Sequence, residues 1–78
     1  ALEAEHPLAS VLCRRAMIQW TLHRERRSRY GYAARHLKTC EHVDGVLANY
    51  EGHPDHSGFL QDLRHAHGGK RAFWRRVK

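Results

Sequence analysis

The chain has 78 residues and a formal net charge of +6 with its eight histidines counted as neutral. A chain of this length forms one domain, residues 1–78, whose single core supplies only about 3 to 5 kcal/mol of net stability. It has no apolar run long enough to cross a membrane and no signal-peptide pattern, so we expect a cytoplasmic protein that does not associate with membranes.

The first residue indicates whether the chain is part of a longer protein, and the cysteines indicate whether it has disulfide bonds. The opening Ala1, in place of a Met, favours an excised or processed domain, and we expect it to be the C-terminal part of a larger protein. Two cysteines, Cys13 and Cys40, are too few for the disulfide framework of a small secreted domain. We expect both to be reduced, buried thiols.

A first helix is predicted from His6 or Pro7 to about Arg27, because a proline in the first turn loses no helical hydrogen bond. At 100° per residue this helix has two apolar faces. The broad face consists of Ala9, Leu12, Cys13, Ala16, Met17 and Trp20, and the narrow face consists of Val11, Ile18 and Leu22. The positions that suit water are Ser10, Arg14, Arg15, Gln19 and Thr21.

Because a surface helix ordinarily buries one stripe, the second face needs a second partner. We expect the second helix to cover the broad face. The narrow face then contacts another protein chain, another domain or a second copy. The alternative is that residues near the C-terminal end cover the narrow face and make it internal core; the candidates are Phe73 and Trp74, or Phe59 and Leu63.

A second helix is predicted from about Arg29 to Asn49, after a joint or N-cap at Ser28 and antiparallel to the first helix. Its inner arc is Tyr30, Ala33, Ala34, Leu37, Cys40, Leu47 and Ala48. A third helix is predicted from Pro54 or Asp55 to the Gly68 and Gly69 pair, which suits a left-handed C-terminal cap. Its inward residues are Phe59, Leu60, Leu63 and Ala66.

A last short helix, from about Lys70 to Val77, places Phe73, Trp74 and Val77 against the rest of the domain. No stretch alternates with the period of two that a half-buried strand needs. The predicted fold is therefore all-α, an antiparallel helical hairpin with a third helix and a short C-terminal helix.

Residues 6–9, 15–18, 28–37 and 63–74 carry a resemblance that extends over nearly the whole chain. Through them the chain resembles the C-terminal helical region of a bacterial protein family of unknown function, which implies no activity. Tyr30, Ala33 and Leu37 have a spacing that more distantly resembles tetratricopeptide-like hairpins, although the full signature of that repeat is missing. The second resemblance implies a scaffold for partner binding, and neither implies a catalytic residue.

Basic residues gather in two clusters, residues 24–38 and residues 70–78, with aromatic residues among them. Such a composition suits phosphate contacts and base stacking. The residues that would bind nucleic acid are Arg24, Arg26, Arg27, Arg29, Arg71, Arg75 and Arg76. We favour the alternative that these arginines solvate helix ends and that Arg75 or Arg76 pairs with a nearby acid. The sequence leaves open whether the basic ends are neutralised by the acidic middle of the chain, which holds Glu41, Asp44, Glu51, Asp55 and Asp62.

The histidines raise the question of a metal site. His36, Cys40 and Asp44 stand at i, i+4 and i+8 on one helical row, and zinc takes thiolate and neutral imidazole ligands. The spacing matches no zinc finger, and the sequence has no C-x-x-C pair. We favour surface or packing roles for the histidines and expect no cofactor, with a zinc site on this row as the alternative.

Catalysis has little support in the sequence. His36 and Cys40 have the spacing of an activated thiolate pair, but Cys40 lies on the stripe that we expect to be buried. We therefore expect a non-catalytic protein-interaction or scaffold module that binds its partner through Val11, Ile18 and Leu22. The alternative function is nucleic-acid binding through the two basic clusters.

Overall fold

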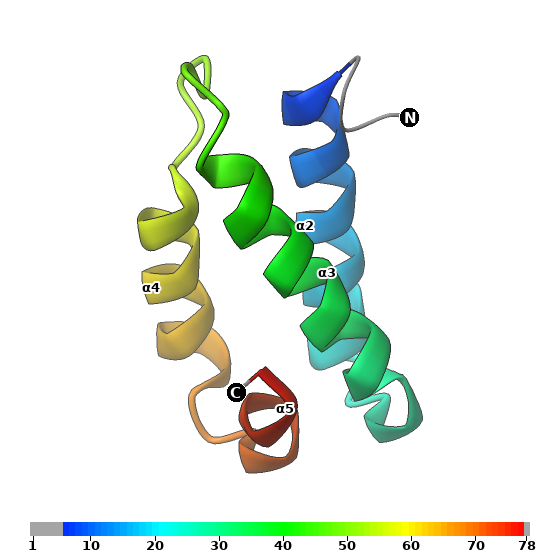
Figure 1. Ribbon diagram of the computed structural model, residues 1–78. Helices are drawn as coiled ribbons and strands as arrows, with labels where there is room; N and C mark the ends of the chain where they lie inside the picture. The colour runs from blue at the N-terminus through cyan, green and yellow to red at the C-terminus, as the bar shows by residue number, and fades with distance from the viewer. Residues whose placement is uncertain (1–5, 78) are drawn as a thin grey trace.

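The computed structural model describes residues 6–77, and the regular elements in that part of the chain are all helical. The elements are the helix α2 (Pro7–His23), the short 3-10 helix η1 (Arg27–Arg29), and the helices α3 (Tyr30–Asp44), α4 (His56–His67) and α5 (Arg71–Val77). Helices α2 and α3 form an antiparallel hairpin, α4 lies beside α3, and α5 packs near the start of α3 (Figure 1). The predicted all-α fold is confirmed.

The first two helices end earlier than predicted. Helix α2 ends at His23 because Glu25 adopts a left-handed conformation, with φ of 54°, which turns the chain into η1. Ser28 lies in η1, the joint between the two helices. Helix α3 ends at Asp44, whose carboxylate accepts hydrogen bonds from the Tyr50 hydroxyl and the His56 backbone N–H. These bonds hold residues 45–55 as a loop instead of a continued helix.

The ends of α4 are set by different groups. Asp55 is the N-cap, and its carboxylate accepts a hydrogen bond of 2.9 Å from the Gly58 backbone N–H. The left-handed cap predicted at the glycine pair is wrong for Gly68, which has a right-handed φ of −60°. Glycine suits that position because a Cβ there would lie 2.5 Å from the Arg64 carbonyl oxygen.

The narrow face of α2 lies in the centre of the core. Val11, Ile18 and Leu22 are each 0% exposed, in one cluster with residues from α3, α4 and α5. The prediction that these three residues bind a partner protein is therefore wrong. The alternative cover suggested by the sequence is present, because Phe59, Leu63 and Phe73 are buried in the same cluster and Trp74 packs against it.

The broad face of α2 points outward, contrary to the prediction that the second helix covers it. Met17 is 54% and Trp20 45% exposed, and Ala9, Cys13 and Ala16 are exposed as well. The buried stripe instead includes polar positions that were assigned to water, namely Ser10, Arg15 and Thr21. Cys40 is buried as predicted, whereas Cys13 is not, and both thiols are free.

Within the described residues, no helix combines the length and the apolar character needed to span a bilayer.

Two neighbouring substitutions on α2 test its orientation. Ile18→Asp should unfold the domain, because an unpaired carboxylate in the core costs more than the roughly 3 to 5 kcal/mol that holds so small a fold together. Met17→Glu, on the exposed face, should change the free energy of unfolding by no more than about 0.5 kcal/mol. Thermal unfolding, monitored by circular dichroism, distinguishes the effects of the two substitutions. A native-like transition for Ile18→Asp would contradict the orientation.

Candidate interaction surface

An open groove runs between α2 and α3 on the outer side of the hairpin. It has a volume of about 280 Å³, and its apolar lining is Ala16, Met17, Trp20, Tyr32 and Ala33. The small alanines leave room between the helices, and the three large side chains stand along the sides. A second hollow of about 340 Å³ shares Met17, Arg29, Tyr32 and His36 with the first. The two form one continuous depression, the α2–α3 groove.

Arginines surround the aromatic side chains of this groove. The guanidinium carbons of Arg24 and Arg26 lie 5.6 and 5.3 Å from the ring centre of Trp20. Arg35 lies 5.1 Å from the ring centre of Tyr32. Contacts of this kind stabilise a cation over an aromatic face by about 0.5–1 kcal/mol at exposed sites. The groove therefore has an apolar centre and a cationic border.

His36 and Arg14 meet at the edge of the groove. Arg14 Nη1 donates a hydrogen bond of 2.8 Å to His36 Nδ1, which places the ring proton of neutral His36 on Nε2. Burial and the adjacent Arg14 charge lower the pKa of His36. The imidazole is therefore neutral near pH 7.

The positions of His36, Cys40 and Asp44 exclude the zinc site that was the alternative. His36 already accepts a hydrogen bond from Arg14. Cys40 is buried, with its Sγ 3.9 Å from the Val11 carbonyl oxygen. Asp44 accepts hydrogen bonds from Tyr50 and His56. Across residues 6–77, no group of three or more histidine, cysteine or acidic side chains is arranged to hold a metal ion. The helical row His36, Cys40 and Asp44 therefore does not form a metal site.

The two basic clusters meet at one end of the molecule. The α2–α3 turn and α5 lie at the same end (Figure 1), and a Cβ on Gly31 would lie 3.3 Å from Arg76 Nη1. A hollow of about 450 Å³ between them is lined by Arg27, Lys70 and Arg71, with Glu25 and His67. We call this region the basic end.

Two residues of the acidic middle lie far from the basic end. Glu51 and Asp55 lie in the loop that joins α3 to α4, at the opposite end of the hairpin (Figure 1). Among the described residues, the carboxylate that pairs with the basic end is Glu25, 3.7 Å from Lys70 Nζ. Glu51 and Asp55 therefore do not provide the internal neutralisation that the sequence leaves open. The cluster 24–38 is also divided, because Arg24, Arg26, Arg29 and Arg35 border the groove while Arg27 faces the basic hollow.

Sequence reasoning missed a buried polar cluster at the loop end of the hairpin. Arg15 is 6% exposed, and its guanidinium carbon lies 4.7 Å from the Phe59 ring centre and 5.3 Å from that of Tyr50. Burial and the bond to Asp44 raise the pKa of Tyr50 to about 12. The bond from Tyr50 lowers the pKa of Asp44, so this contact favours an ionised carboxylate beside a protonated phenol. The cluster attaches the 45–55 loop to α2 and α4.

His56 belongs to the same region and also has buried nitrogens without a hydrogen-bond partner. It is 6% exposed, and neither ring nitrogen has a hydrogen-bond partner; the carboxylate of Glu41 lies 3.9 Å from Nε2. Burial lowers the pKa of His56 and outweighs the opposing effect of Asp44 and Glu41. A buried neutral imidazole without partners destabilises the fold by about 1–3 kcal/mol.

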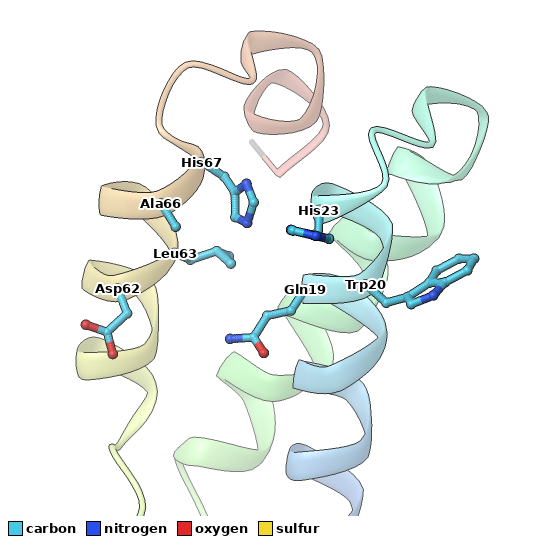
Figure 2. Close-up of a pocket in the computed structure, with 7 residues that line it drawn as sticks. All are labelled: Gln19, Trp20, His23, Asp62, Leu63, Ala66 and His67. Atoms are coloured by element: carbon cyan, nitrogen blue, oxygen red, sulfur yellow. The ribbon is translucent and has the colours of Figure 1, made fainter.

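A further hollow of about 430 Å³ separates α2 from α4. Figure 2 shows Gln19 and His23 facing Leu63 and His67 across it, while Trp20 points away. Burial, Lys70 and His23 lower the pKa of His67, and its buried Nδ1 has no partner. The polar groups that line this hollow are the imidazoles of His23 and His67, the amide of Gln19 and the carboxylate of Asp62.

The chain belongs to the DUF6880 family, a family of unknown function that matches residues 1–76. No curated protein and no solved structure matches the chain. The resemblance to a family of unknown function is therefore confirmed at that level.

Three histidines with lowered pKa values predict how stability depends on pH. The folded-state pKa values of His36, His56 and His67 are lowered, so the unfolded chain takes up protons first on acidification. The free energy of unfolding should be at its plateau above about pH 6.5 and fall as the pH decreases below it. Urea unfolding at about pH 7.5 and about pH 5 measures this.

A histidine pair provides the control for that prediction. His56→Leu should lose less stability on acidification than the unmodified chain, whereas His53→Gln, at an exposed loop position, should not. Stability that rises on acidification would contradict the neutral, buried state of these imidazoles.

Proposed function

We propose that this member of the DUF6880 family is a non-catalytic protein-interaction module that binds another protein along the α2–α3 groove. The observation that supports this most strongly is the exposure of three large side chains on one surface, with Met17 at 54%, Trp20 at 45% and Tyr32 at 57%. A single exposed apolar residue is ordinary in a folded protein. A group of Met, Trp, Tyr and Arg side chains, however, has the composition of an interface centre.

The shape of the groove supports a protein partner over a small molecule. The groove is open along the hairpin, and its two overlapping hollows, about 280 and 340 Å³, lie at the lower end of the usual range for ligand sites. It has room for one or two side chains of a partner. His36, the imidazole at its edge, accepts a hydrogen bond from Arg14 through Nδ1.

This proposal keeps the interaction function expected from the sequence but moves it to another surface. The partner-binding residues become Met17, Trp20 and Tyr32 in place of the buried narrow face. A scaffold role within a larger, cytoplasmic bacterial protein, as the C-terminal part or a tetratricopeptide-like hairpin, belongs to the same proposal. The uncovered face of α2 supports it.

Site-specific photo-crosslinking tests the proposal. A photoreactive amino acid at position 17 should give a discrete protein adduct in cells that contain the natural partners, and Trp20→Ala should suppress it. The matched control carries the photoreactive group at position 61, where Gln61 is exposed on α4 outside the groove. Equal adducts at both positions, or no protein adduct at position 17, would rule out the groove as the docking surface.

Nucleic-acid binding by the basic end is the second candidate function. The observation that favours it is the meeting of Arg27 from the turn with Lys70 and Arg71 from the C-terminal segment in one hollow. The acidic loop lies at the other end of the hairpin (Figure 1), and the acidic residue that lines this hollow is Glu25, which pairs with Lys70. Phosphates are the natural ligands of such a surface.

A fluorescence titration with a short RNA or DNA oligonucleotide tests this second candidate. If it holds, the affinity should fall about a hundredfold between roughly 50 and 200 mM salt, as expected for about four neutralised phosphates. Arg27→Glu with Arg71→Glu should abolish binding, while Met17→Glu should leave it unchanged. Absence of binding at low salt would eliminate this function.

A further inference from the structure

The α2–α3 groove has a chemistry that identifies its partner more closely. We infer that the groove binds an acidic amphipathic helix, in which an apolar stripe fills the centre and flanking carboxylates meet the arginines. This inference rests on the proposed function, since it names the partner class for the same surface.

The cationic border supplies the first argument. Arg24 and Arg26 lie over Trp20, and Arg35 lies over Tyr32, at 5.1 to 5.6 Å from the ring centres. Among residues 6–77, none of these three arginines forms an ion pair with a carboxylate. A guanidinium held over a ring still has N–H donors at its edge, which suit a carboxylate from a partner.

The lining of the groove supplies the second argument. Among residues 6–77, those that line the two hollows are apolar, neutral polar or basic, and none of them is acidic. A partner with carboxylates beside its apolar stripe would therefore meet attraction along the whole border. A basic partner would meet like charge, which costs affinity and slows association.

The dimensions of the groove favour a helix as the bound segment. On the α3 side the groove extends from Arg29, the last residue of η1, to His36 in α3. The two are seven residues apart, which corresponds to about 10 Å at the rise of an α-helix. Apolar anchors at i, i+4 and i+7 of a helix span the same length. A helix laid between two antiparallel helices also packs by the same ridges and grooves that form helical bundles.

The apolar centre distinguishes this surface from a nucleic-acid site. Ala16, Met17 and Ala33 belong to its lining, and none of these side chains offers a hydrogen bond or a stacking plane to a base. An apolar stripe on a protein helix matches this centre better than a phosphate backbone does. The basic end, with Arg27 and Arg71, is a separate surface.

A pair of synthetic helical peptides tests the inference. Both have ~18 residues and leucines at i, i+4 and i+7 spacing, and the flanking positions carry Glu in one peptide and Lys in the other. Fluorescence anisotropy with the full chain should show the Glu peptide binding at least about tenfold more tightly than the Lys peptide. Trp20→Ala should weaken the affinity for the Glu peptide by about tenfold or more.

A charge-matched pair of double variants locates the effect. Arg24→Glu with Arg26→Glu should reverse the preference in favour of the Lys peptide. Arg71→Glu with Arg75→Glu changes the net charge equally on α5 and should leave the preference for the Glu peptide in place. Circular dichroism of each variant confirms that the fold is retained.

The outcomes separate the inference from the proposed function. If both peptides bind equally and Trp20→Ala removes this binding, the inference of an acidic partner is overturned. The proposal that the groove is a docking surface is then retained. Binding of neither peptide, or binding that Trp20→Ala does not weaken, would overturn both. An RNA oligonucleotide that binds through Arg24 and Arg26 while neither peptide binds would instead assign the groove to nucleic acid.

Discussion

The rotation of α2 about its own axis determines which surfaces of this domain are buried and which are exposed. Val11, Ile18 and Leu22 are completely buried, and Phe59, Leu63 and Phe73 from α4 and α5 belong to the same core cluster. The edge-to-face contact between Tyr30 and Phe73, 6.0 Å between ring centres, joins α5 to the start of α3. With the narrow face enclosed by the later helices, the broad face is left outside. The exposed groove is thus a consequence of how the core closes.

Arg15 shows why this rotation was difficult to predict from the sequence. Val11, Arg15, Ile18 and Leu22 form one buried stripe at helical spacing, but a charged residue occupies its second position. Together with the buried Ser10 and Thr21, this arginine makes the core face look polar. Its burial depends on the Tyr50 and Phe59 rings, which come from a loop and from another helix. Only the folded arrangement brings them together.

Other features could be predicted directly from the sequence because they depend on local patterns. The start of α2 at Pro7 and the buried arc of Tyr30, Ala33 and Leu37 are as predicted. The end of α3 could not be predicted in this way. It depends on hydrogen bonds that Tyr50 and His56 donate to Asp44, six and twelve residues earlier in the chain. The separation of acidic and basic charge also depends on topology. Val11, Ile18 and Leu22 were therefore assigned to the wrong surface, although the expectation of two unequal apolar faces was sound.

The central claim is that the broad face of α2 lies in water and that its opposite face lies in the core. The two cysteines test this claim directly, because Cys13 is exposed and Cys40 is buried. Burial also raises the pKa of the Cys40 thiol. A chromogenic thiol reagent added to the folded protein should modify one cysteine rapidly, and Cys13→Ala should remove that reaction. Cys40 should react only when the protein unfolds. Protection of Cys13 in a monomeric, folded protein, or rapid reaction of Cys40, would contradict the account.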